Sequence, residues 1–129
     1  MREIIFRGKC QTGEWVFGGF LNRNGKPEIG DWDRAEEGDF TFTTPIDPET
    51  IGQYTGLKDK NGKMIFEGDI VHIDNYDEGW DSTVEFKGGA FAVDVEGKEY
   101  DYTAIGWLEY EVEIIGNIHD NPELLEAKS

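Results

Sequence analysis

The chain has 129 residues, which is enough for one domain whose core needs no disulfide or metal to hold it. Its 28 acidic and 12 basic residues give a formal net charge of −16, which argues against direct binding to nucleic acid or to an anionic membrane. A single cysteine excludes an internal disulfide, and no apolar run approaches the roughly 20 residues that span a bilayer. We therefore expect a protein of the cytoplasm.

The first third of the chain is typical of short strands joined by glycine-containing turns. Pro45 and Pro48 bracket a connection that we take as the internal boundary, so residues 1–49 form an N-terminal antiparallel β extension. Gly18-Gly19 predicts a bulge or kink within a strand. The predicted strands are 2–7, 14–21 and 39–44, the predicted turns are 9–13 and 22–27, and 29–39 is a predicted surface loop.

The stretch 50–73 has the densest turn chemistry and the clearest strand pattern. Asn61-Gly62 favours a tight reversal, so 54–57 and 64–66 should pair as a hairpin. Gly68 predicts a second turn, after which 70–73 is a β-branched strand. The sequence Gly-Asp-x-Val at this point commonly opens a strand in small SH3-like barrels, an analogy with known folds.

The last part of the chain continues in the same style. Asn121 and Pro122 are good N-terminal signals for a short helix over 121–126, and 104–109 is either a loop or one helical turn. The predicted class is mainly β, with a small SH3-like barrel and a short C-terminal helix over residues 50–129, and both parts form one domain. The predicted strands are 82–87, 90–95, 98–103 and 111–118, and 74–81 is a predicted acidic turn.

Covalent catalysis has little support in the sequence. Cys10 lies beside Lys9, which lowers a thiol pKa modestly, but nothing brings His72 or His119 to it. The two serines lack a G-x-S-x-G motif, and no glycine-rich phosphate-binding motif occurs. We therefore predict no catalytic residue and no cofactor.

Two weak metal patterns have plainer explanations. A zinc site would require the fold to gather His72, Asp74, His119 and Asp120, which otherwise are ordinary polar residues at strand ends. The turn after Ile73 resembles a calcium loop, but its third position is Tyr76, where an oxygen ligand is needed, and its flanks are strands. We therefore predict an acidic hairpin turn and no metal. The calcium-like positions are Asp74, Glu78, Gly79 and Glu85.

Aromatic residues are numerous, and on a sheet they normally fill a core or pair across strands. Trp32 and Trp80 lie in polar acidic stretches, where burial is less expected. They are our candidates for an exposed groove that binds a peptide or protein. The acidic neighbours that would favour a basic partner are Asp31, Asp33, Asp77, Glu78 and Asp81.

Three blocks of sequence resemble the YopX family, small proteins encoded by bacteriophages and prophages. They are Arg2 to Arg7 followed by Trp15, then 50–71 with its core TIGQYTGLKDKNGK, then 115–125 with IGNIHDNPELL. His119-Asp120 stands where family members often carry an aromatic-acidic pair. The resemblance implies a cytoplasmic, mostly β protein with SH3-like barrel character and no established biochemical activity, so it brings no catalytic residues with it.

These observations lead to a non-enzymatic interaction module of phage or prophage origin, acting in the host cytoplasm. It would bind a protein partner or a second copy of itself through strand edges and aromatic loops. An alternative is an acidic mimic of DNA that inhibits a host nucleic-acid-binding protein. A third hypothesis is a small enzyme or metal-binding protein that uses His72, His119 and nearby acids.

Overall fold

The computed structural model describes residues 4–31, 43–95 and 98–126. Antiparallel strands dominate these residues, with one short α-helix, so the predicted mainly β class is confirmed. The chain divides into two compact units, Met1–Tyr54 and Thr55–Ser129. The sequence places the boundary slightly earlier, after Glu49.

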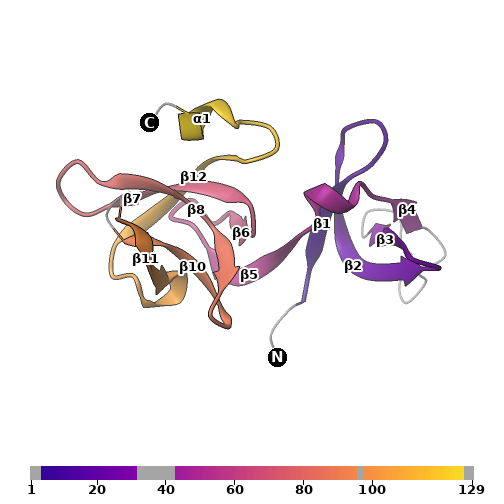
Figure 1. Ribbon diagram of the computed structural model, residues 1–129, viewed down its shortest axis with the longest axis horizontal. Coiled ribbons are helices and arrows are strands. Elements are labelled where there is room, and N and C mark those ends of the chain that lie inside the picture. The colour runs from indigo at the N-terminus through magenta and orange to yellow at the C-terminus, as the bar shows by residue number, and fades with distance from the viewer. Residues whose placement is uncertain (1–3, 32–42, 96–97, 127–129) are drawn as a thin grey trace. The chain divides into compact units, whose positions relative to one another are not determined.

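The first unit is a sheet of four strands in the order β4-β3-β2-β1 (Figure 1). The start of β5 pairs with β1, where Gln53 lies opposite Phe6. Val16, Ile29 and Ile46 are buried in its core, and Phe6 packs on them. The elements are β1 (Phe6–Lys9), β2 (Trp15–Arg23), β3 (Lys26–Asp31), β4 (Thr43–Pro45) and the 3-10 turn η1 (Pro48–Thr50).

Strand β3 corrects the prediction of a turn and a surface loop over its residues. Asn24 and Gly25 both have positive φ, 54° and 83°, which gives the tight hairpin twist that brings β3 back along β2. Ile29 is then fully buried. Pro27 and Gly30 hide this strand from a pattern search, because both residues are uncommon in strands. Residues 32–42, with the remainder of the predicted loop and most of the predicted strand 39–44, lie outside the described residues.

Glycine at position 18 is required by the close approach of two strands. A Cβ built on Gly18 would overlap the carbonyl oxygen of Gly30 on β3, whereas a Cβ on Gly19 would meet nothing. The pairing of β2 with β3 nevertheless runs through both glycines without a register shift, so the predicted bulge is wrong.

The second unit contains two three-stranded antiparallel sheets, β12-β7-β8 and β11-β10-β9, together with β6 and the later part of β5. No closed barrel is found among the described residues of this unit. Its elements are β5 (Gly52–Lys58), β6 (Met64–Phe66), β7 (Asp69–Asp74), β8 (Trp80–Thr83), β9 (Glu85–Lys87), β10 (Ala90–Val95), β11 (Lys98–Ala104), the 3-10 turn η2 (Ile105–Trp107), β12 (Glu111–Asn117) and α1 (Glu123–Glu126).

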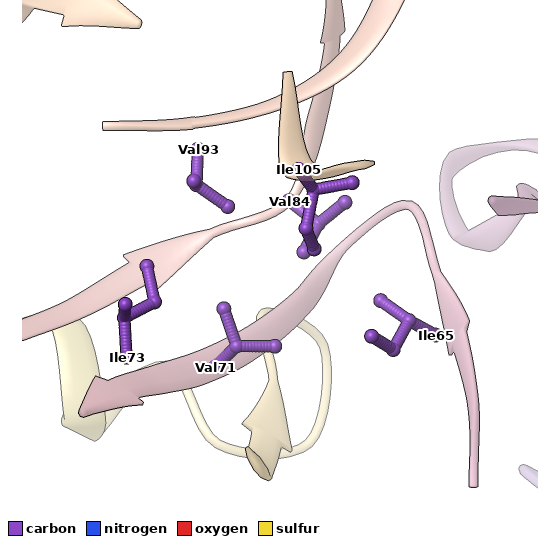
Figure 2. Close-up of a cluster of buried hydrophobic side chains, with 6 residues drawn as sticks. All are labelled: Ile65, Val71, Ile73, Val84, Val93 and Ile105. Atoms are coloured by element: carbon purple, nitrogen blue, oxygen red, sulfur yellow. The ribbon is translucent and has the colours of Figure 1, made fainter. Parts of the chain in front are cut away.

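Branched aliphatic side chains from both sheets share one core (Figure 2). Alternate residues of β7 point into it, since side chains of a strand alternate between its faces. Burying each such side chain stabilises the fold by about 1.5–3 kcal/mol. The members are Ile65, Val71, Ile73, Val84, Val93 and Ile105.

Turn chemistry was predicted well in this unit. Gly88 and Gly89 have φ of 61° and 84° and join β9 to β10 in a hairpin, as predicted. Gly68 has a φ of 89° and forms the predicted turn before β7. The stretch 104–109, predicted to be either a loop or one helical turn, contains η2, a single 3-10 turn in which Ile105 is buried.

Candidate functional site

Asp59 anchors the turn between β5 and β6. Its Oδ1 accepts hydrogen bonds from the backbone N–H groups of Asn61 and Lys63, both at 2.9 Å. Its Oδ2 accepts one from the backbone N–H of Ile114 on β12, at 3.0 Å. Burial raises the pKa of the Asp59 carboxyl, but these three donors outweigh burial and hold that pKa below its ordinary value. Asp59 thereby ties the hairpin to β12.

The loop between β7 and β8 presents an aromatic residue in a strained conformation. Tyr76 has a φ of 68°, a region that bulky residues seldom adopt, and 82% of it is exposed. The carboxylate of Asp74 accepts its backbone N–H, while Asn75 Oδ1 accepts the N–H groups of Asp77 and Gly79. The loop is thus held by its own side chains, and in Figure 1 it extends beyond the strands that it joins.

Three aromatic rings lead from this loop toward the core. The ring centroids of Tyr76 and Tyr110 lie 6.0 Å apart at an angle of 70°, and those of Tyr110 and Trp80 lie 6.2 Å apart at 84°. Both pairs have the edge-to-face geometry that aromatic quadrupoles favour. Trp80 is packed against the core, so the row runs from an exposed tyrosine to a half-buried tryptophan.

The charged residues of the β7–β8 loop, beside the exposed end of this row, are acidic. We define the acidic aromatic face as the exposed residues Asp74, Tyr76, Asp77, Glu78 and Tyr110. A surface of carboxylates beside ring faces attracts lysine and arginine by charge and by cation–π contact.

Of the residues predicted to form an interaction surface, some lie in the exposed loop as expected and others lie in a strand. Asp77 and Glu78 are exposed as expected. Trp80, however, does not lie in a loop: it begins β8, and its indole N–H donates to the carbonyl oxygen of Asp94 at 3.0 Å. Asp81 is also in β8, and its carboxylate lies 2.7 Å from Nδ1 of His72. Strand register explains why Trp80 and Asp81 lie in a strand, because the pairing of β7 with β8 already begins at Ile73 and Trp80.

Three of the seven residues of the predicted surface are either outside the described residues or described only by their backbone. Trp32 and Asp33 lie outside the described residues. Asp31 ends β3, and its side chain is not described. Tyr76 and Tyr110 were missed by sequence reasoning, because no local pattern distinguishes an exposed tyrosine from a core one. Trp107, also 82% exposed, was missed for the same reason.

The candidate metal ligands do not form a ligand group. His72 pairs with Asp81, and the backbone N–H of His119 donates to Asn117 Oδ1 at 3.0 Å. Within residues 4–31, 43–95 and 98–126, no cluster of three or more His, Cys, Asp or Glu side chains has the geometry of a metal site. The calcium-like stretch is the loop of an antiparallel hairpin, which confirms the turn that was predicted there.

Cys10 lies in the turn between β1 and β2, as expected. Its Sγ lies 3.0 Å from Thr12 Oγ1. Hydrogen bonds from the side chain and the backbone of Thr12 lower the pKa of the thiol.

None of the described helices has the length and apolarity that crossing a membrane requires.

A cleft of about 430 Å³ opens in the second unit, near Tyr110. Polar and apolar atoms share its wall about equally, and its charged side chains are two lysines and two acids. Its lining residues are Leu57, Lys58, Asp59, Lys60, Ile65, Ile105, Gly106, Leu108, Tyr110, Glu111 and Val112.

The sequence of this chain is similar to those of known proteins. Residues 5–126 match the family described as YopX protein. The SPbeta prophage-derived uncharacterized protein YopX of Bacillus subtilis (strain 168) is 44% identical over 71 residues, which cover 51% of this chain and 53% of that protein. The matched part of the chain thus spans about half the length of that relative.

Two crystal structures share the fold. Protein YopX from Bacillus subtilis superposes with a TM-score of 0.62 and 24% identity, covering 96% of this chain and 98% of that one. A protein from Enterococcus faecalis gives a TM-score of 0.55 and 24% identity, covering 97% and 99%. At this identity they show the fold alone. The family match spans nearly the whole chain, and this protein therefore belongs to the YopX family.

Proposed function

We propose that this protein is a non-enzymatic interaction module that binds a basic protein partner through the acidic aromatic face. The observation that carries the proposal is Tyr76, a bulky residue held at a φ of 68° with 82% of it exposed. Such strain costs about 1–3 kcal/mol and persists only where the surroundings impose it, which is typical of binding loops.

The surroundings of Tyr76 support a basic partner. Asp77 and Glu78 follow Tyr76 in the loop and are exposed. The ring of Tyr110, the residue before β12, packs edge-to-face against the Tyr76 ring. Tyrosine is among the residue types that most often carry the binding energy of protein interfaces. An arginine-containing loop or helix of a partner would find both a ring face and carboxylates here.

Affinity capture from a lysogenic or infected host tests this proposal. Wild-type protein and the Tyr76→Asn variant would be used as baits, because Asn tolerates positive φ and replaces the ring with a small carboxamide. A partner enriched by the wild type and at least about tenfold less by the variant supports the face. Equal recovery of every protein by both baits overturns it.

An acidic mimic of DNA is the second candidate, and the net charge of −16 favours it. The mimic would occupy the phosphate-binding surface of a host protein, and its complex would weaken steeply with salt. Recovery of nucleic-acid-binding proteins that are released between about 50 and 200 mM salt supports the mimic. Recovery of such proteins unchanged by salt counts against it.

Further features of the proposal rest on the sequence and on family membership. The protein acts in the host cytoplasm and does not bind nucleic acid directly, as expected from its acidity. We propose SH3-like barrel character for the second unit, on the ground that its two sheets share one core, although their strands do not close into a barrel among the described residues. Its open strand edges allow self-association. Light scattering tests the last point, because a constant monomer mass at high concentration would exclude a homo-oligomer.

A further inference from the structure

The chain contains two Asn-Gly pairs, Asn24-Gly25 and Asn61-Gly62, and both occupy exposed turns. Asparagine before glycine is the sequence most prone to deamidation, because glycine has no side chain to shield its peptide nitrogen. Basic residues flank both pairs in nearly the same tetrapeptide, Arg-Asn-Gly-Lys and Lys-Asn-Gly-Lys. A difference in reactivity between the two pairs in the folded protein must therefore come from the structure around them.

Deamidation requires freedom of the glycine nitrogen and of the asparagine side chain. The peptide nitrogen of the glycine attacks Cγ of the asparagine, the bond from Cγ to Nδ2 breaks, and the amide group leaves as ammonia with the proton of the glycine nitrogen. Water then opens the cyclic imide at one of its two carbonyl carbons, which yields aspartate or isoaspartate. A hydrogen bond that holds the glycine N–H or the asparagine side chain opposes the first step, and a bond of about 1 kcal/mol slows it about fivefold.

Hydrogen bonds hold Asn61-Gly62 at each group that the reaction has to move. The N–H of Gly62 donates to the carbonyl oxygen of Asp59, and the N–H of Asn61 donates to the Asp59 carboxylate, both at 2.9 Å. The side-chain Nδ2 of Asn61 donates to a carboxylate oxygen of Glu113 on β12, at 3.3 Å. The attacking nitrogen, the backbone and the departing amide are thus all held, and Asp59 fixes the turn to β12.

Asn24-Gly25 is held less firmly. The N–H of Gly25 donates to Oδ1 of Asn22 at 2.9 Å, a bond between exposed groups. Among the described residues, no hydrogen bond or ion pair holds the side chain of Asn24. The pair forms the tip of the β2–β3 hairpin, beyond the last paired residues, Arg23 and Lys26. The reacting groups of Asn24-Gly25 are therefore freer to meet than those of Asn61-Gly62.

We propose that Asn24-Gly25 is a site of spontaneous deamidation in the folded protein, and that the contacts from Asp59 and Glu113 protect Asn61-Gly62. Formation of isoaspartate moves one methylene of the asparagine into the main chain. A two-residue hairpin turn has no place for it, so the modification breaks the pairing of Arg23 with Lys26 and adds a negative charge at the hairpin tip. This inference goes beyond the proposed function, since no residue of the acidic aromatic face takes part.

Peptide mapping by mass spectrometry tests the proposal on the full-length protein, incubated at mildly alkaline pH either folded or in concentrated guanidinium chloride. The mass change from NH₂ to OH marks deamidation, and enzymatic methylation of the peptides identifies isoaspartate. In denaturant both pairs should react at nearly equal rates, whereas in the folded protein Asn24 should react at least about fivefold faster than Asn61. Equal rates in the folded protein, a faster Asn61, or a folded Asn24 that stays intact while the unfolded one reacts would overturn the proposal.

Exposed substitutions test the hydrogen bonds that restrain each pair. Asn22→Ala removes the acceptor of the Gly25 N–H and should speed the reaction of Asn24 at least about twofold, with Asn61 as the internal control. Glu113→Ala frees the side chain of Asn61 and should speed its reaction by a similar factor without changing that of Asn24. Glu113→Gln keeps an acceptor and should behave as wild type. Unchanged rates at both sites in the two alanine variants would contradict the proposal.

Discussion

The carboxylate of Asp59 accepts a hydrogen bond from the backbone N–H of Ile114 at 3.0 Å, across 55 positions of the sequence. The same side chain accepts two N–H groups of its own turn, so one residue fixes the turn and joins it to β12. The register of β12 shifts directly after Ile114, between Ile114 and Gly116. Asp59 therefore stabilises β12 at the position where its ladder is interrupted.

Replacing Asp59 should destabilise the fold more than replacing any exposed acid. Asp59→Ala leaves three backbone donors without their acceptor, which should cost about 3 kcal/mol. Asp59→Asn should also destabilise, since its single oxygen cannot serve donors on both sides. Urea unfolding measures the loss, and Asp101→Asn, an exposed acid on β11, is the control. Equal stability of the Asp59 and Asp101 variants would contradict the role of Asp59.

The same carboxylate should make stability depend on pH in a defined direction. Its pKa in the folded state lies below the ordinary 3.8, because the backbone donors outweigh burial. Its contribution is therefore complete above about pH 3.8 and is lost as the pH falls through the folded-state pKa. The difference in unfolding free energy between wild type and Asp59→Asn should stay constant at neutral pH and shrink in acid. A difference that grows in acid would have the wrong sign.

Glycine 18 offers a matched test in the first unit. Gly18→Ala would drive a Cβ into the carbonyl oxygen of Gly30, whereas Gly19→Ala enters open space. Because the obstacle is backbone, the strands must separate, and we expect a loss of at least about 2 kcal/mol. Thermal unfolding of the two variants measures this. A Gly18→Ala protein as stable as Gly19→Ala would show that β2 and β3 lie farther apart.

Tyr76 should matter little for stability. Tyr76→Asn relieves part of the strain at a φ of 68° but loses an edge-to-face contact with Tyr110. These effects are each about 1 kcal/mol and opposite in sign, so the unfolding free energy should change by less than about 1 kcal/mol. A loss above about 2 kcal/mol in urea unfolding would mean that the ring is part of the fold.

Sequence reasoning worked where local chemistry decides the structure. The Gly88-Gly89 hairpin, the Gly68 turn and the strands that flank them follow from backbone preferences of a few residues. The turn after Lys58 is predicted from Asn61-Gly62, yet the side chain that accepts its backbone N–H groups is that of Asp59. A hydrogen bond to Ile114, so distant in the chain, has no local signal.

Side-chain exposure was less predictable than strand position. Trp80 looked like a loop residue because acids and glycine surround it, but strand register carries it onto the core. Nothing in the sequence distinguishes Tyr76 from the other aromatic residues. Its exposure depends on the strained φ and on Asp74 and Asn75 side chains that hold the loop, and these exist only in the folded hairpin. Strand β3 was missed because Pro27 and Gly30 disguise it.

The most direct test of the acidic aromatic face is the dissociation constant of a captured partner, measured with purified proteins. Tyr76→Asn and the double variant Asp77→Lys, Glu78→Lys should each weaken binding at least about tenfold. Tyr102→Asn, an exposed tyrosine on β11, should leave it unchanged. Binding that is insensitive to Tyr76, Asp77 and Glu78 but lost with Tyr102→Asn would contradict the account and move the interface to another surface.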